Sequence, residues 1–224
     1  MTLIRVSDEE NNSMMDLEKV NNCRSYLLAK RCMDIVGAVL GLIILFPVFL
    51  IVALLIKYED PKGSVFFKQV RVGKNGKEFH MYKFRSMVTD AEKKLKNLLQ
   101  YNEVSGAMFK MKDDPRVTKI GKFIRKTSID ELPQLFNVLR GDMSLVGPRP
   151  PLVREVSEYT TYDKQRLLVT PGCTGLWQVS GRSNIGFNEM VELDLFYITN
   201  RSIVFDIKII LKTVLVLFGS KDAF

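Results

Sequence analysis

The stretch from Lys119 to Pro151, KIGKFIRKTSIDELPQLFNVLRGDMSLVGPRPP, decides how the rest of the chain is organised. Two adjacent carboxylates, Asp130 and Glu131, lie at its centre. Pro133 follows them, and because proline is tolerated only in the first turn of a helix, we predict a helix that begins near Asp130. Gly141 is a normal stop signal for this helix. Its apolar face is predicted to consist of Leu132, Leu135, Phe136 and Leu139.

Two caps are compatible with the start of this helix. Asp130 can itself be the N-cap. Ser128 and Glu131 instead make a capping box, which starts the helix two residues earlier. The position of Pro133 favours the later start.

The Asp-Glu pair has a plain interpretation, in which the two carboxylates only complement the helix dipole. Its surroundings favour a second one, because a helix start ringed by Arg and Lys is an anion site. Carboxylates inside such a site can hold a metal ion or attack phosphorus. The cations upstream are Lys119, Lys122, Arg125 and Lys126.

The loop after the predicted helix, GDMSLVGPRP, presents Arg149 between Pro148 and Pro150. Two prolines restrict the backbone, so this loop loses little entropy when it binds a ligand. A guanidinium can grip a phosphate with two parallel hydrogen bonds. We therefore expect Arg149 to contact a phosphate-bearing substrate.

The segment DELPQLFNVLRGDMSLVGPRP resembles the bacterial sugar transferases, the monotopic phosphoglycosyl transferases that load polyprenol phosphate with a sugar phosphate. The similarity extends from about Ala29 to Leu217. It implies a UDP-sugar as donor, undecaprenyl phosphate as acceptor, and UMP and a polyprenyl-diphosphate-sugar as products. It also implies that Asp130 is a covalent nucleophile and that Asp130 and Glu131 hold Mg²⁺. Such a reaction would initiate capsule, exopolysaccharide or O-antigen synthesis.

Further basic residues extend the expected site. The segments KFRSM and TGLWQVSGR resemble those of hexose-transferring members, which favours UDP-glucose or UDP-galactose. Trp177 in the second segment is either a core residue or, as the resemblance implies, close to the active site. The expected substrate-binding residues are Lys83, Arg85, Arg125, Pro148, Arg149, Pro150 and Arg182.

The composition of the chain fits an anionic partner in a reducing compartment. The 224 residues carry a net charge of +8 and a pI near 9.3, which suits membranes, nucleotides or nucleic acid. Three widely spaced cysteines and a single histidine, His80, give neither a disulfide framework nor a zinc pattern. We interpret His80 as structural. The oligomeric state stays open, a homodimer included.

Two other functions fit less well. A membrane-tethered nucleic-acid-binding module needs basic residues interleaved with exposed aromatics, whereas here the basic cluster surrounds carboxylates that repel a phosphate backbone. We therefore expect no nucleic-acid partner. A scaffold that kept the fold but lost its chemistry is disfavoured by the intact pair Asp130-Glu131 and by Arg149.

The run from Ile35 to Ile56 contains no charged residue and is long enough to cross a bilayer, which takes about 20 apolar residues. Pro47 near its middle predicts a kink, and basic residues flank both ends, which fits a helix that enters the membrane and returns to the same face. A membrane-crossing helix with a tolerated proline is the alternative that the charges leave open. The resemblance implies a re-entrant helix broken at a Ser-Pro pair, where this chain has Phe46-Pro47.

The expected fold class is α/β, in the mixed α+β sense. We predict a flexible polar tail over residues 1–28, a re-entrant membrane helix over 29–58, and a catalytic domain over 59–224. That domain would lie on the cytoplasmic face of the inner membrane, anchored monotopically to the lipid bilayer. Asn75-Gly76 between β-rich runs predicts a hairpin. The apolar segment Ile203–Phe218 predicts a helix with Asp206, Lys208 and Lys212 on one side and a wide apolar face, which either lies on the membrane, as a membrane-associated helix, or packs on the domain.

Overall fold

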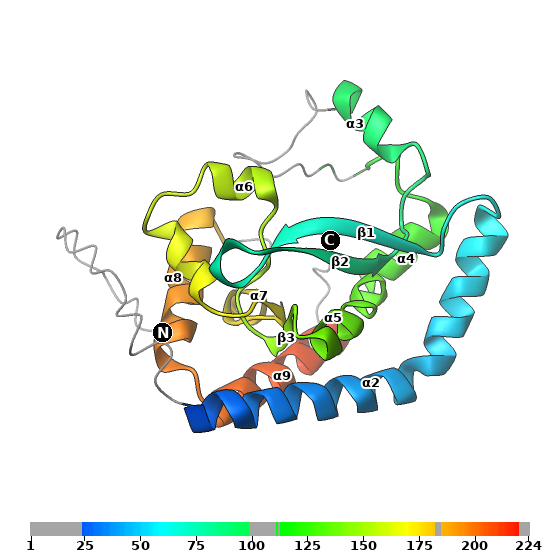
Figure 1. The fold of residues 1–224 in the computed structure, drawn as a ribbon. Coiled ribbons are helices and arrows are strands. Elements are labelled where there is room, and N and C mark those ends of the chain that lie inside the picture. Colours follow the sequence, from blue (N-terminus) through cyan, green and yellow to red (C-terminus); the bar gives the residue numbers. More distant parts are fainter. Residues whose placement is uncertain (1–23, 99–110, 112, 182–184, 220–224) are drawn as a thin grey trace.

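The computed structural model describes residues 24–98, 111, 113–181 and 185–219 (Figure 1). Within these residues the chain is mixed helix and sheet, as predicted, with a long apolar helix at its N-terminal end and a two-stranded hairpin. Most of the predicted tail, together with Arg182, lies outside them.

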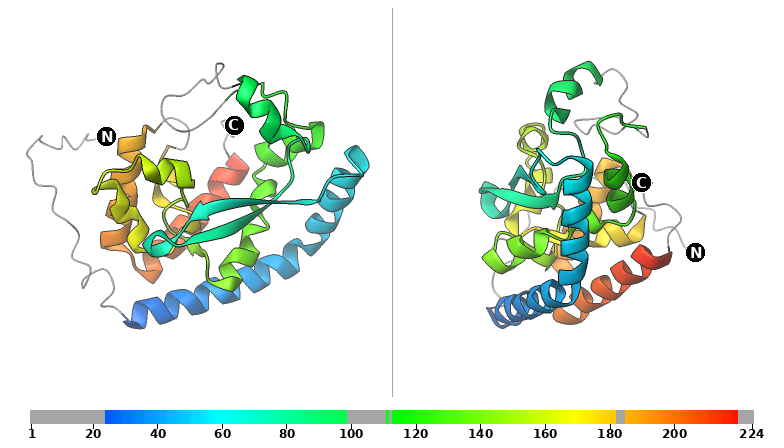
Figure 2. Two further views of the ribbon diagram at one scale, coloured as in Figure 1. Left: turned by 45° about the horizontal axis from the view of Figure 1, so that its top comes forward. Right: turned by 90° about the vertical axis from the view of Figure 1, so that its right-hand side faces the viewer.

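Helix α2 (Arg24–Glu59) is a single helix that continues through Pro47. It begins before residue 29, where the membrane segment was predicted to start. In Figure 1 it runs along the lower edge of the molecule and then turns upward, and Figure 2 shows the same bend from a second direction. An interior proline removes one helical hydrogen bond and crowds the preceding turn, which accounts for a bend without a break.

Both ends of α2 are bonded to the same folded body. Near its start, Lys30 pairs with Asp206 at 2.9 Å. At its end, the Glu59 carboxylate accepts hydrogen bonds from the backbone amides of Lys119 and Ile120, at 2.8 and 3.1 Å. The helix is therefore tied to the body at both ends, and its buried residues Ala38, Val52 and Ile56 pack against the body between them.

The predicted hairpin is present. Strands β1 (Phe66–Val72) and β2 (Glu78–Phe84) pair antiparallel, joined through the short turn η1 (Lys74–Gly76). Asn75 and Gly76 have φ of 57° and 77°, the left-handed conformation that a tight hairpin turn requires and that Asn and Gly adopt most readily. The pairing of Phe67 with Lys83 and of Gln69 with Met81 fixes which side chains share a face.

The central stretch folds differently from its predicted form. Helix α4 (Lys119–Lys126) is followed by the 3₁₀ turn η3 (Ile129–Glu131), and only then by helix α5 (Gln134–Arg140). Neither predicted cap is used: Ser128 is left-handed with φ 56° and makes no capping bond, and Pro133 is the N-cap of α5. Since the proline ends the turn instead of standing inside the helix, the carboxylate pair precedes α5. Gly141 ends α5 with φ 87°, as predicted.

The second half of the chain packs against this centre. Strand β3 (Ser144–Val146) pairs parallel with β4 (Gly172–Thr174), and a core cluster lies beside the two strands. The helices of this half are α6 (Val153–Ser157), η4 (Asp163–Leu168), α7 (Leu176–Ser180), α8 (Phe187–Asn200) and α9 (Ile203–Gly219). In the first half, helix α3 (Ala91–Leu98) follows the hairpin.

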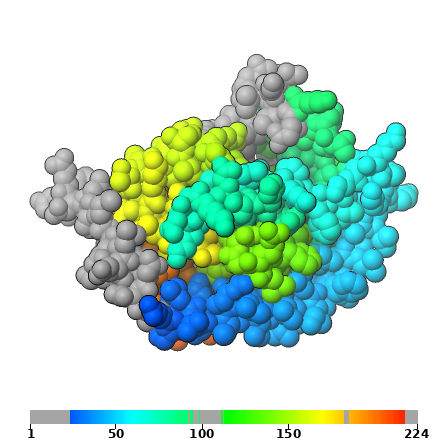
Figure 3. All heavy atoms as spheres, viewed as in Figure 1, coloured from blue at the N-terminus to red at the C-terminus, as the bar shows by residue number. Residues whose placement is uncertain are grey.

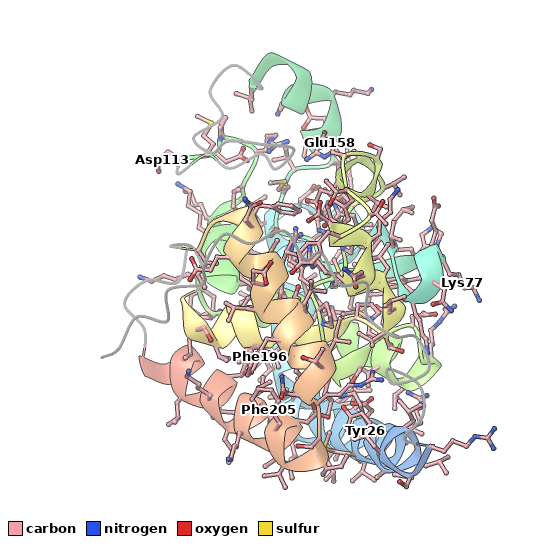
Figure 4. The ribbon with its side chains drawn as sticks, turned by 90° about the vertical axis from the view of Figure 1, so that its left-hand side faces the viewer. Tyr26, Lys77, Asp113, Glu158, Phe196 and Phe205 are labelled. Carbon is pink, nitrogen blue, oxygen red and sulfur yellow. The ribbon has the colours of Figure 1, made fainter. Side chains whose placement is uncertain are left out.

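The prediction that Asp206 lies on the polar side of the last helix is wrong. Its side chain is fully buried. Its carboxylate accepts hydrogen bonds from Lys30 at 2.9 Å, Tyr26 at 3.0 Å and Tyr197 at 2.7 Å. Figure 4 shows Tyr26 and Phe205 at the lower edge, where α2 and the start of α9 meet. Lys208 and Lys212 are exposed, as predicted.

An exposed apolar surface, which we call the apolar base, covers α2 and α9. Side chains of α2 form the lower edge of the molecule in Figure 3. A monomeric soluble protein rarely exposes so many large apolar side chains on two helices. Among the described helices, α2 is the one long and apolar enough to cross a membrane by length and composition. The apolar base includes Leu40, Ile43, Ile44, Phe46, Leu50, Ile51 and Leu54 of α2, and Val204, Ile207, Leu211, Val214 and Leu215 of α9.

We predict that Asp206→Ala lowers the free energy of unfolding by about 3–5 kcal/mol, because it leaves the charge of Lys30 buried without its partner. Thermal unfolding of the detergent-solubilised protein measures this loss. The exposed Lys208→Ala is the control and should stay within about 0.5 kcal/mol of the parent protein. Equal midpoints for the two variants would contradict a structural role for the buried pair.

Candidate active site

The carboxylate pair occupies the turn between α4 and α5. The left-handed Ser128 reverses the chain direction after α4, and η3 then carries Asp130 inward. Asp130 is 8% exposed, whereas the side chain of Glu131 is 39% exposed. The two neighbouring carboxylates therefore have different environments.

Burial raises the pKa of Asp130 to about 6; Lys83 lowers it and Glu131 raises it further. The sequence suggested that Lys122, Arg125 and Lys126 keep this carboxylate charged. Those three side chains are exposed on α4, and the charge of Arg125 offsets only part of the effect of burial. At pH 7 a group with this pKa is still roughly nine-tenths ionised.

Glu131 is held by Lys83, whose Nζ lies 2.6 Å from Oε1. Partial burial raises the pKa of Glu131, but the cations of Lys83, Arg149 and Arg71 more than offset it, so that this pKa lies below its ordinary value. Glu131 is therefore the permanently charged member of the pair, and Asp130 is the member that titrates near neutral pH.

A cavity of about 150 Å³ opens beside Glu131. The structure brings four of the predicted site residues to its wall: Lys83, Glu131, Arg149 and Pro150. Asp130 is not on this wall, although its carboxylate interacts with Lys83 and Glu131. The wall also contains Arg71, Met81, Gln134, Gly172, Cys173, Trp177 and Gln178.

Arg71 is the site residue that sequence reasoning missed. Its guanidinium is buried, donates to the Pro150 carbonyl at 2.9 Å, and donates to Gln69 Oε1 at 2.7 and 3.1 Å. Burial, and then the neighbouring Arg149, lower its pKa to about 10. The alternation of side chains along the predicted hairpin could have identified Arg71. It places Arg71 on the same face as Gln69 and as Lys83 of the paired strand.

Arg149 lines the cavity and also pairs with Glu155 Oε2 at 3.2 Å. The same Oε2 accepts a hydrogen bond from the Leu152 amide at 2.8 Å, so Glu155 ties the proline-flanked loop to the start of α6. Pro148 is not on the wall, but its carbonyl accepts from the Gly172 amide at 2.8 Å. The loop is thereby held at both sides of Arg149.

The remaining predicted residues lie apart from this wall. Arg125 is exposed on α4. Arg85 pairs with Asp60 at 2.7 Å, at the point where α2 returns to the body. Trp177 lines the cavity, which agrees with the interpretation that places it near the site. His80 lies in β2, as predicted, with its carbonyl bonded to Asn137.

The side chains of Asn137 and Arg31 hold α5 in place through hydrogen bonds. Asn137 is fully buried, accepts a hydrogen bond from the Tyr82 amide at 3.0 Å and donates to the His80 carbonyl at 2.7 Å. Arg31 of α2 donates to the carbonyls of Val138 and Leu139, at 2.6 and 2.8 Å. These bonds fix α5 against β2 and α2. Glu131 lies in the turn just before α5, and Lys83 lies in β2, so the same packing brings the two side chains together.

The donor set is suited to a hard cation. No group of three or more His, Cys, Asp or Glu side chains converges anywhere in the described part of the chain. Mg²⁺ does not need one, since it is usually held by one or two carboxylates together with substrate phosphates and water. The oxygens of Asp130 and Glu131 fit that requirement.

We predict that Asp130→Asn stabilises the fold at pH 7 by up to about 3 kcal/mol, because the parent protein keeps a buried charge whose pKa is raised from 3.8 to about 6. A raised carboxyl pKa favours the folded state as pH falls, so the advantage of the variant should shrink below pH 6. Unfolding midpoints at pH 7 and pH 5 measure both effects. Asp113→Asn is the control, because the Asp113 side chain is 85% exposed. A stability difference between Asp130→Asn and the parent protein that grows as the pH falls would contradict the prediction.

A comparison with known proteins gives one family. The family model described as bacterial sugar transferase matches residues 25–220. A galactosyl transferase named CpsE, from Streptococcus agalactiae serotype III (strain NEM316), is 56% identical over 88% of this chain and 44% of its own length. An undecaprenyl-phosphate galactose phosphotransferase from Salmonella typhimurium (strain LT2) is 45% identical over 90% of this chain and 43% of its own length.

A shorter relative is matched over most of its length. The exopolysaccharide production protein ExoY of Sinorhizobium fredii (strain NBRC 101917 / NGR234) is 41% identical over 84% of both chains. By contrast, this chain spans less than half the length of the Streptococcus and Salmonella proteins.

Proposed function

The chain belongs to the bacterial sugar transferase family, and from that premise we propose that it transfers a sugar 1-phosphate from a UDP-sugar to undecaprenyl phosphate. The products are UMP and a polyprenyl-diphosphate-sugar. The observation that carries the proposal is the ion pair of Glu131 with Lys83, next to the buried Asp130 and beside a cavity lined by two arginines. The acceptor is supported by the name of the Salmonella relative.

The diphosphate of the donor binds to the cations of the cavity. Arg71, Lys83 and Arg149 present their charges from the hairpin and from the proline-flanked loop, so the same cavity receives both phosphates. Arg71 and Arg149 are already fixed by Pro150 and Glu155, which reduces the entropy lost on binding. Because Arg71 donates to the Pro150 carbonyl and to Gln69 Oε1 at the same time, we expect lysine to be a poor substitute at this position.

Transfer takes place in two steps at one phosphorus. A carboxylate oxygen of Asp130 forms a bond to the sugar-bearing phosphorus, and the bond from that phosphorus to the bridging oxygen breaks, so the electron pair leaves with UMP. A phosphate oxygen of undecaprenyl phosphate then bonds to the same phosphorus. The bond to Asp130 breaks and the carboxylate is regenerated.

The environment of Asp130 suits a nucleophile. A pKa of about 6 leaves the carboxylate mostly ionised at neutral pH while its basicity exceeds that of an ordinary aspartate. Lys83 offsets the charge of Glu131 and so reduces the repulsion between the pair and the donor. Mg²⁺ held by Asp130 and Glu131 would neutralise charge on the donor phosphates.

Catalysis takes place at a membrane surface, because the acceptor is a lipid phosphate. The proposal is supported by the apolar base and by α2, whose two ends are bonded to the same body. We assign α2 as a re-entrant helix and the body to the cytoplasmic face of the inner membrane. The donor is then a cytoplasmic nucleotide sugar.

The sugar is a hexose, galactose or glucose. The Streptococcus and Salmonella relatives carry galactose in their names, and the Sinorhizobium relative is named for exopolysaccharide production. The reaction proposed for this chain would then supply the first lipid-linked sugar of a surface polysaccharide.

Mass spectrometry of the full chain tests the two-step path. With UDP-galactose or UDP-glucose and Mg²⁺, but without undecaprenyl phosphate, we expect the protein to gain one hexose phosphate on Asp130. Asp130→Asn should form no adduct, and its turnover should fall on the order of 10⁴-fold or more. Removing Mg²⁺ with a chelator should stop turnover, and adding it back should restore it.

The control for this experiment is Asp113→Asn, which should form the adduct and turn over normally. UMP release that strictly needs both substrates, with no adduct on the parent protein, would instead indicate direct transfer through a ternary complex. The stability of Asp130→Asn, measured separately, shows whether lost activity reflects lost folding.

Cysteine labelling in intact cells tests the path of α2. Cys23 precedes the helix and can report on that end once Cys32 and Cys173 are replaced by serine, and Lys77→Cys reports on the hairpin turn. We expect an impermeant maleimide to label neither position until the cells are permeabilised. Labelling of Cys23, but not of position 77, from outside would show that α2 crosses the membrane.

A further inference from the structure

A second cavity of about 150 Å³ lies away from the carboxylate pair. Its wall is built where the N-terminal part of α2, the hairpin turn and the segment after α8 meet. It contains none of the site residues that the sequence predicted. Asp34 is the single carboxylate among the described residues that line this cavity, so we consider it as a site for binding a ligand.

Cations dominate the wall of this cavity. Lys30, Arg31, Lys74 and Arg201 line it, against a single acidic residue, Asp34. Asp206 lies behind Lys30, and even with it included the cations outnumber the acids by four to two. A concave wall with an excess of positive charge attracts anions.

All four cations also have contacts within the protein. Lys30 pairs with Asp206, and Arg31 donates to the last carbonyls of α5. Lys74 and Arg201 come from segments far apart in the sequence, the hairpin turn and the residue that follows α8. Arg201 lies over the ring of Tyr26 at 5.5 Å, which orients its guanidinium near the start of α2. The fold therefore gathers four separate cations around one small space.

The position of the cavity points to the class of ligand. Asp34 is its last α2 residue, and the next residues, Ile35 and Val36, already belong to the exposed apolar surface of the helix. Under the membrane orientation proposed above, on which this step rests, the cavity lies at the depth of lipid headgroups. Basic pockets at that depth bind phosphate-bearing headgroups.

We propose that this cavity binds a phosphate group, carried by an anionic phospholipid or by free inorganic phosphate. Arginine and lysine differ in how they bind it: the guanidiniums offer paired donors, and the ammonium groups supply point charges. A phosphate here joins the start of α2 to the hairpin turn and to the α8–α9 connection, and so stabilises the docking of the membrane helix.

The test is the unfolding midpoint of the full chain in two kinds of nanodisc. We expect a higher midpoint in discs that contain phosphatidylglycerol than in discs of pure phosphatidylcholine, because the choline cation neutralises the phosphate charge in the second lipid and only the first headgroup is net anionic. Lys74→Ser and Arg201→Gln should each reduce this gain by about 2–4 °C, the shift expected for one lost headgroup contact in a chain of this size. Adding inorganic phosphate to the phosphatidylcholine discs separates the sources: a restored gain indicates free phosphate, and no gain indicates the lipid.

Lys77→Ser is the matched control, because Lys77 ends the same hairpin turn but is not on the cavity wall. Figure 4 shows its side chain at the outer edge of the molecule. Equal losses for Lys77→Ser and Lys74→Ser would overturn the proposal in favour of general surface charge. A gain that survives Lys74→Ser also overturns it, and so does the absence of any gain with either probe.

This experiment is independent of turnover. If the transferase reaction proposed above is wrong, the midpoints still report on phosphate binding. If the membrane orientation is wrong, the lipid arm gives no gain while the inorganic phosphate arm remains informative. Should Arg201→Gln fail to fold, Lys74→Ser at the exposed turn still decides the outcome.

Discussion

The buried carboxylate of Asp206 holds the two halves of this fold together. It lies on α9, yet its partners are Lys30 and Tyr26 of α2 and Tyr197 of α8. An unpaired charge in such a place costs several kcal/mol, so the three elements must assemble as a unit or not at all. The apolar residues of α2 also pack against the body, with the side chains of Leu145 and Leu135 lying on Gly37 and Gly41. The polar residues at its N-terminal end add the ion pair and hydrogen bonds that apolar packing lacks.

The same part of α2 sets the position of the candidate active site. Arg31, one residue after Lys30, bonds to the C-terminal carbonyls of α5, where the helix dipole favours a cation. Asn137 ties the middle of α5 to β2. The position of Glu131 beside Lys83 therefore depends in part on how α5 packs against α2 and β2. Helix α5 connects the start of α2 to the candidate active site.

The electrostatics of the site work against the stability of the fold. Asp130 is buried deeply enough to raise its pKa to about 6, and Arg71 is buried deeply enough to lower its own to about 10. A fold selected only for stability would expose both groups or neutralise them. Fixed charges of opposite sign close to one cavity would suit the reaction proposed above, since they need no rearrangement when a charged substrate arrives.

The sequence by itself determined the hairpin, the long apolar helix and the family of this protein. Asn75-Gly76 specifies the hairpin through backbone conformation, and the motif around Asp130 carries the family resemblance that the family model confirms. Only the tertiary structure decided that Pro133 caps α5 instead of standing inside it, that Asp206 is an anchor, and that Arg71 faces the cavity while Arg85 pairs with Asp60. Burial and charge pairing depend on residues far apart along the chain, and no local pattern records which distant segment will cover a given side chain.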